Sequence, residues 1–76
     1  MSRWSPCKQR DFIRKLRRLG FIGPFPGTRH LFMRYGSSRL ALPHYEEYSV
    51  PQLKTLLKEV ELLLGRKISL KEWNQL

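Results

Sequence analysis

Two prolines flanked by glycines split this chain into parts that cannot belong to one continuous helix. The segment reads Gly23-Pro24-Phe25-Pro26-Gly27, and proline has no amide hydrogen to donate within a helix. Regular apolar spacing predicts helices on both sides of it, and the residues directly after it have the composition of strands. A chain of 76 residues therefore has to combine the two kinds of element in a single domain, residues 1–76.

The residues before the proline segment predict an amphipathic, strongly basic helix. Ser5 suits the N-cap, Pro6 the first helical position and Gly20 the stop. The apolar stripe consists of Phe12, Ile13, Leu16 and Leu19, and the opposite face carries Lys8, Arg10, Arg14, Lys15, Arg17 and Arg18.

Two helices are predicted near the end of the chain. Ser49 and Gln52 have the spacing of a capping box, and Gly65 ends the helix that follows. Ser69 and Glu72 repeat the capping spacing before a short C-terminal helix. The apolar stripe of the longer helix consists of Leu53, Leu56, Leu57, Val60, Leu63 and Leu64, and Ile68, Leu70 and Trp73 of the last segment are expected to pack on the core.

The middle of the chain predicts a β-hairpin. Thr28–Tyr35 and Arg39–Leu42 are rich in apolar residues, with a Gly-Ser-Ser turn between them. Pro43 ends the second strand because it has no N–H for the ladder. Phe21-Ile22 is expected to add a third, short strand, and Tyr45–Tyr48 a loop.

The predicted order is α-β-β-β-α with a short C-terminal helix, which is an α+β fold. Two helices on one face of a three-stranded antiparallel sheet leave the other face open to solvent. This is the architecture of double-stranded-RNA-binding domains, and the likeness is one of fold alone.

The charge is distributed unevenly along the chain. Residues 1–42 hold ten basic side chains and one acid, Asp11, which accounts for the whole net charge of +9. Residues 43–76 hold five side chains of each sign. A basic half favours contact with a polyanion such as RNA, and a solvated helix face is the alternative.

Cysteine and histidine are too sparse for a metal site or an internal disulfide. Cys7 is the single cysteine, and His30 and His44 stand alone. We therefore expect no metal or cofactor. Neither a signal peptide nor a membrane-spanning segment is expected, which indicates the cytoplasm.

Several short motifs follow one another in the order typical of HicA-like toxins. They are Arg18-Leu19-Gly20-Phe21, Gly27-x-x-His30-x-Phe32, Leu40-Ala41-Leu42-Pro43-His44, then Glu47 and Leu53-x-x-Leu56-Leu57. The chain resembles this family, which belongs to bacterial toxin–antitoxin pairs. The resemblance implies a double-stranded-RNA-binding-like fold, cleavage of messenger RNA and inhibition by a HicB-like antitoxin protein. It also implies that a histidine of a Gly-Ser-His segment carries out the cleavage.

The sequence departs from the family pattern at that segment. It reads Gly27-Thr28-Arg29-His30, so an ungapped alignment places Arg29 at the family's catalytic position and His30 one residue later. In a strand, one residue later means the opposite face. Either a bulge after Gly27 returns His30 to the site, or the site itself has changed.

Metal-independent RNA cleavage needs a base for the 2′-hydroxyl proton and cations for the phosphorane. Imidazole titrates near neutrality, and the guanidinium fork binds two phosphate oxygens. His30 is the candidate catalytic residue, with a hydrogen-bonded surface or strand-end histidine as the alternative. Glu46 and Glu47 are expected to be a solvated loop pair, with orientation of a histidine as the alternative. The candidate RNA-binding residues are Arg10, Arg14, Arg17, Arg18, Thr28, Arg29, Arg34, Arg39 and His44. Phe32 is expected in the core, with base stacking as the alternative.

Three classes of function fit the sequence. The first is an endoribonuclease toxin, the second a non-catalytic RNA-binding module on the same fold, and the third a protein-interaction domain for an acidic partner. The first two share the basic surface and differ in whether a histidine acts on the bound RNA.

Overall fold

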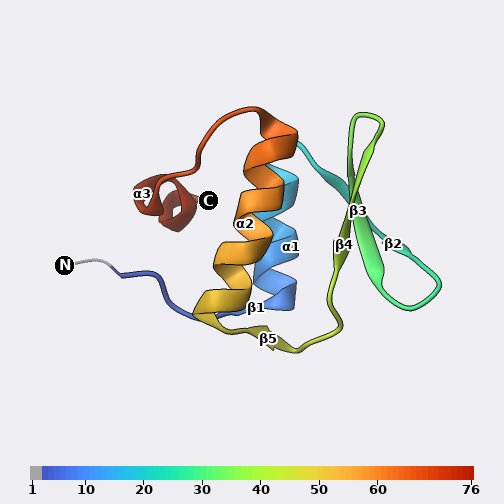
Figure 1. Cartoon of the computed structure of the whole chain (residues 1–76), viewed down its shortest axis with the longest axis horizontal. Helices are drawn as coiled ribbons and strands as arrows, with labels where there is room; N and C mark the ends of the chain where they lie inside the picture. Colours follow the sequence, from blue (N-terminus) through green and yellow to red (C-terminus); the bar gives the residue numbers. More distant parts are fainter. Residues whose placement is uncertain (1–2) are drawn as a thin grey trace.

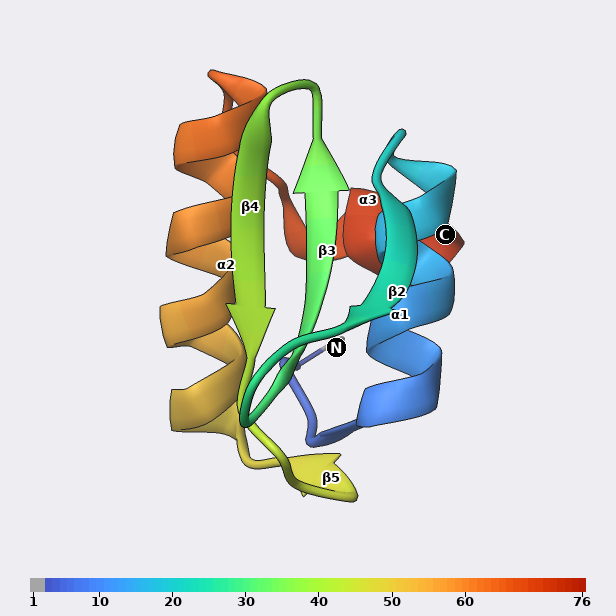
Figure 2. The same ribbon diagram turned by 90° about the vertical axis from the view of Figure 1, so that its right-hand side faces the viewer.

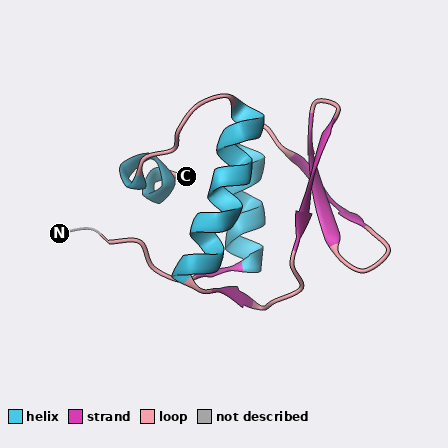
Figure 3. Ribbon diagram, in the orientation of Figure 1, coloured by secondary structure: helices cyan, strands magenta, loops and turns pink. Residues whose placement is uncertain are grey.

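The computed structural model describes residues 3–76 and has an α+β fold (Figures 1 and 3). The elements in chain order are β1 (Cys7–Lys8), α1 (Gln9–Arg18), β2 (Ile22–Pro26), β3 (Leu31–Tyr35), β4 (Ser38–Leu42), β5 (Glu47–Tyr48), α2 (Val50–Leu64) and α3 (Leu70–Gln75). The three-stranded antiparallel sheet and the flanking helices are thus confirmed, with two short strands added.

The sheet forms one outer layer of the molecule. Its strand order is β2-β3-β4, and α1 and α2 lie behind it, α1 beside β2 and α2 beside β4 (Figure 2). Helix α3 lies on the far side of the helix pair from the sheet (Figure 1). Within residues 3–76 no helix covers the opposite face of the sheet, which we call the open face.

The register of the hairpin decides which side chains reach the open face. Met33 lies opposite Leu40 in the sheet, and both are buried among the helices. Alternation then directs Phe32 and Arg34 to the open face.

The start of α1 differs from the prediction. Ser5 and Pro6 precede the helix, whose N-cap is Lys8. Cys7 pairs with Tyr48 in a two-stranded ladder, and Cys7 is 8% exposed. In the ladder the Cys7 side chain is buried and its backbone groups are hydrogen-bonded. This stabilisation outweighs the preference of Ser5 for the N-cap position. The same ladder turns part of the predicted 45–48 loop into a strand.

Tyr48 links this ladder to α1 and to the end of the sheet. It is fully buried, and its hydroxyl donates to the Pro43 carbonyl oxygen at 2.8 Å. The Gln9 side-chain amide donates to the Tyr48 hydroxyl at 3.0 Å and to the same carbonyl at 3.1 Å. The Phe12 ring meets Tyr48 edge-on and also contacts Trp73 of α3, each at a centroid distance of 5.5 Å.

The predicted caps of the later helices are largely confirmed. The Ser49 and Gln52 side chains form the reciprocal capping box, and Gly65 ends α2 in the left-handed conformation with φ of 75°. Ser69 caps α3 by accepting from the Glu72 amide at 3.1 Å. The Glu72 carboxylate pairs with Arg66 at 2.7 Å instead of completing a second box.

Removing the Tyr48 hydroxyl should destabilise the fold. In Tyr48→Phe the half-buried Gln9 amide and Pro43 carbonyl each lose one of their two hydrogen-bond partners and keep each other, so we expect the free energy of unfolding to fall by about 1 kcal/mol. Chemical denaturation at neutral pH measures this. Tyr45→Phe is the matched control, since Tyr45 is 52% exposed and should change stability by less than about 0.5 kcal/mol. Equal effects of the two changes would contradict a stabilising role for the Tyr48 hydrogen bonds.

Candidate nucleic-acid interface

Two arginines face each other directly on the open face of the sheet. Arg34 of β3 is the cross-strand partner of Arg39 of β4, and both side chains are exposed. Like charges at this position repel. No acidic residue occurs between Asp11 and Glu46, so the sheet itself supplies nothing to neutralise them. The pair is suited to bind an anion from solvent.

An aromatic row lies beside the arginine pair. The Phe25 and Phe32 rings of neighbouring strands are 5.4 Å apart between centroids, and the Arg39 guanidinium lies 3.8 Å from the Phe32 centroid. Phe25 and Phe32 are both half-buried. The expectation that Phe32 belongs to the core is therefore wrong, because the register directs it away from the helices.

His30 lies in the turn between β2 and β3, outside the strand pairing. Pairing begins at Pro26 with Leu31, and the register irregularity falls between Ile22 and Phe25. A bulge after Gly27, which the sequence left open, is therefore absent from the described ladder. Strand alternation does not govern the direction of His30, because the residues from Gly27 to His30 belong to no strand.

The turn is tight at Gly27. A Cβ atom built there would overlap the His30 carbonyl oxygen, so a larger residue has to displace the His30 backbone. Glycine at this position allows the chain to fold back on itself directly before β3.

A shallow hollow of about 290 Å³ brings several predicted residues together. It is lined by Gly27, Thr28, Arg29, His30, Leu31, Phe32, Arg39 and Ala41. Arg29 and His30 are both exposed. The two candidates for the family's catalytic position therefore lie at the same site, next to the aromatic row.

A second groove, of about 490 Å³, borders His30 on the α2 side. Pro51, Thr55 and Glu59 of α2 line it together with His30. Glu46 and Glu47, the orienting groups considered from sequence, lie elsewhere: Glu47 pairs with Lys8 in the small ladder, and Glu46 lines a depression with Arg10. Glu59 is thus the carboxylate that shares a groove with His30, and no short-range sequence pattern indicated it.

The remaining predicted RNA-binding residues do not lie with this cluster. Arg10, Arg14, Arg17 and Arg18 are exposed on α1, which lies behind the sheet (Figure 2). His44 is exposed in the β4–β5 loop and lines neither groove at His30. The basic residues therefore form two separate surfaces, one on the open face and one on the helix layer.

Some of the arginines on α1 make contacts within the protein. Arg14 lies 3.9 Å from Asp11 and donates to the Leu76 carbonyl oxygen at 3.4 Å. Arg17 and Arg18 occupy the last turn of α1, where positive charge stabilises the helix dipole. Arg14 thus has hydrogen-bond and ion-pair partners within the fold, which Arg34 and Arg39 lack among residues 3–76.

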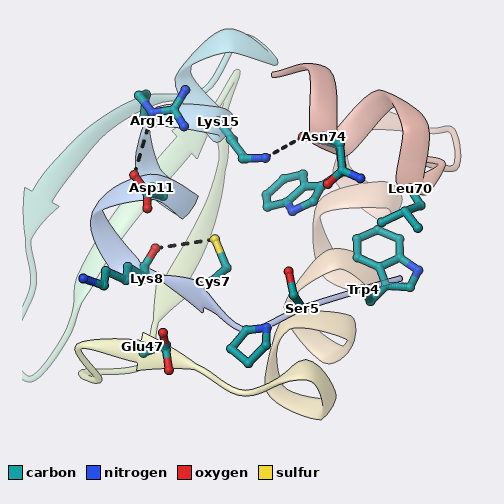
Figure 4. Close-up of a pocket in the computed structure, with 12 residues that line it drawn as sticks. Trp4, Ser5, Cys7, Lys8, Asp11, Arg14, Lys15, Glu47, Leu70 and Asn74 are labelled. Atoms are coloured by element: carbon teal, nitrogen blue, oxygen red, sulfur yellow. Dashed lines mark hydrogen bonds and ion pairs between the residues drawn. The ribbon is translucent and has the colours of Figure 1, made fainter. Parts of the chain in front are cut away.

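A cavity of about 380 Å³ separates α1 from α3 (Figure 4). Lys15 lines it and donates to the Trp73 carbonyl oxygen at 2.6 Å, with its ammonium 4.8 Å from the Trp73 ring centroid. Burial lowers the pKa of Lys15 and raises the pKa of the Cys7 thiol beside it. A protonated thiol is a poor nucleophile, so Cys7 is not a candidate nucleophile, and Lys15 connects α1 to α3 at this cavity.

Within residues 3–76, no cluster of His, Cys, Asp and Glu side chains could hold a metal ion. No helix in the same range is long and apolar enough to cross a membrane. Comparisons of the chain with known protein families, curated proteins and solved structures found no match.

Filling the Gly27 position should move His30. In Gly27→Ala the new methyl group overlaps the His30 carbonyl, so we expect a loss of about 1–3 kcal/mol in stability and a shift of the His30 ring resonances in NMR spectra. Gly36→Ala is the control: Gly36 has φ of 59° with open space around it, so that variant should be strained yet leave His30 unshifted. An unshifted His30 in Gly27→Ala would contradict the tight turn.

The basic composition predicts RNA binding, and the arginine pair should dominate the salt dependence of that binding. Each neutralised phosphate of a single strand contributes about 0.7 to the slope of log affinity against log salt. Arg34→Gln and Arg39→Gln should each reduce the slope by about that amount, measured by fluorescence anisotropy. Lys54→Gln, an exposed cation on α2, is the matched control and should leave the slope unchanged. A slope that the arginine changes do not alter would place the RNA elsewhere.

Proposed function

We propose that this protein is a cytoplasmic toxin of the HicA-like kind, an endoribonuclease that cuts messenger RNA and is held inactive by a HicB-like partner. The observation that carries the proposal is the hollow in which His30, Arg29 and Arg39 meet. It joins the histidine expected from the family resemblance to cations that can bind a phosphate. The helices on one face of a three-stranded sheet agree with the double-stranded-RNA-binding-like fold that the resemblance implies.

The proposed reaction uses groups of this hollow alone. The His30 imidazole accepts the 2′-hydroxyl proton, the 2′-oxygen attacks the adjacent phosphorus, and the 5′-oxygen leaves with a proton returned from the imidazolium. The products are a 2′,3′-cyclic phosphate and a 5′-hydroxyl. In this proposal Arg29 and Arg39, which line the same hollow, stabilise the charge that grows on the phosphorane oxygens.

A partner protein would silence the toxin most directly by covering this surface. An acidic, complementary face would pair with Arg29, Arg34 and Arg39, which form no ion pair within residues 3–76. Such charge complementarity accelerates association and selects the correct partner.

A non-catalytic RNA-binding module is the second candidate. The ungapped alignment, which places Arg29 at the family's catalytic position, favours it. In that case Arg34 and Arg39 still hold RNA, and His30 contributes no chemistry.

Replacing His30 should separate the two candidates. Since His30 is exposed, His30→Ala should preserve stability and RNA affinity while reducing cleavage by about 100-fold or more. The measurement is release of 2′,3′-cyclic phosphate ends by purified protein, with growth arrest on expression in bacteria as a second readout. His44→Ala is the control and should keep activity. Cleavage that survives His30→Ala would remove His30 from the mechanism, and wild-type protein that binds RNA without cutting it would favour the module.

A further inference from the structure

We propose that the row formed by Phe25, Phe32 and Arg39 on the open face is a stacking platform for the unpaired bases of single-stranded RNA. The inference rests on the proposed RNA binding and deepens it by naming the substrate class. It does not depend on which residue performs the cleavage.

The geometry of the row is that of a stacking surface. The two rings come from adjacent strands, are tilted by 31° and lie 5.4 Å apart. The two rings contact each other outside the core, so part of each aromatic surface is left accessible to a ligand. Both rings are half-buried, and neither belongs to the buried core that the helices cover.

Arg39 completes the row in a way that suits RNA. Its guanidinium stacks on the Phe32 ring at 3.8 Å and forms no ion pair in the part of the chain that the structure describes. A guanidinium held by a ring alone can accept a base on its outer face or turn to a phosphate, which frees the ring for a base. Arg34 directly opposite supplies a second cation for the backbone of the same strand.

The platform selects unpaired RNA because base faces are hidden in a duplex. In double-stranded RNA the bases stack on one another, and proteins read mainly the sugar hydroxyls and phosphates. Rings on a sheet bind bases only where these are splayed out, and they do so with little sequence preference.

The platform also directs the strand to the candidate catalytic residue. Phe32, Arg39 and His30 line the same hollow. A base stacked at Phe32 therefore places its neighbouring sugar–phosphate beside Arg39 and His30, where a 2′-hydroxyl is needed for cleavage. A duplex held on the helix layer would not reach this hollow.

The test uses a short 2′-O-methyl oligoadenylate with one 2-aminopurine, which cannot be cleaved because its 2′-oxygen carries no proton. Phe32→Leu keeps an apolar side chain and removes the π-face, whereas Phe32→Tyr keeps the ring. We expect Phe32→Leu and Phe25→Leu to weaken binding by about 5- to 150-fold and to lose the quenching of 2-aminopurine. Phe32→Tyr should retain both. Leu62→Ala, at an 82% exposed position on α2, is the control for a change of exposed apolar surface.

A second arm uses the same oligonucleotide annealed to its complement. The duplex should bind more weakly than the single strand to wild-type protein, and Phe32→Leu should not affect it. Unchanged single-strand affinity in Phe32→Leu would overturn the platform, as expected if this face binds a partner protein instead of RNA, and would leave cleavage by His30 intact. Wild-type protein that binds neither form would refute the proposed function itself.

Discussion

The fold depends on one hydrogen bond, which the buried Tyr48 side chain donates to the Pro43 carbonyl oxygen at 2.8 Å. Pro43 follows the last residue of β4, and Tyr48 lies two residues before α2. The hydrogen bond therefore fixes where the sheet stops and at what point α2 starts to cross behind it. Because Phe12 packs on the Tyr48 and Trp73 rings, the same contact also anchors α1 and α3. The three helices are held by this cluster without any contribution from the open face.

This arrangement separates stabilising residues from those available for binding. On the helix side of the sheet, Met33, Leu40 and Leu42 are buried in the apolar core. No buried side-chain polar atom within residues 3–76 is without a partner. On the open face, in contrast, two charged side chains lie directly across from each other, Arg34 and Arg39, and their repulsion lowers stability. A protein without a use for these charges gains nothing by keeping them together. Their juxtaposition is therefore the strongest structural argument for an anionic ligand on this face.

The sequence predicted elements whose signals are local and missed those decided by distant partners. The caps of α2 at Ser49 and Gly65 were predictable because the capping groups lie within a few residues of one another. The start of α1 was not, since the pairing of Cys7 with Tyr48 joins segments far apart in the chain. Both faces of β3 carry apolar side chains, so its register was undecided from that strand alone. The regular alternation of Arg39–Leu42 was the available signal, because it buries Leu40 and thereby its partner Met33.

The candidate site shows the same division between residue identity and placement. His30 and Arg29 were recognisable as candidates from their residue types and from the Gly27 turn. The prediction that only one of them faces the site assumed that both residues belong to a β-strand. The structure places both in a turn outside the ladder, where alternation has no meaning, and both line one hollow. The basic residues of α1 lie on the other side of the sheet, so a single rigid duplex cannot follow both surfaces at once. A flexible single strand, the ligand proposed above, can cross the open face and reach His30 without contacting the helix surface, so the proposal needs the open face alone.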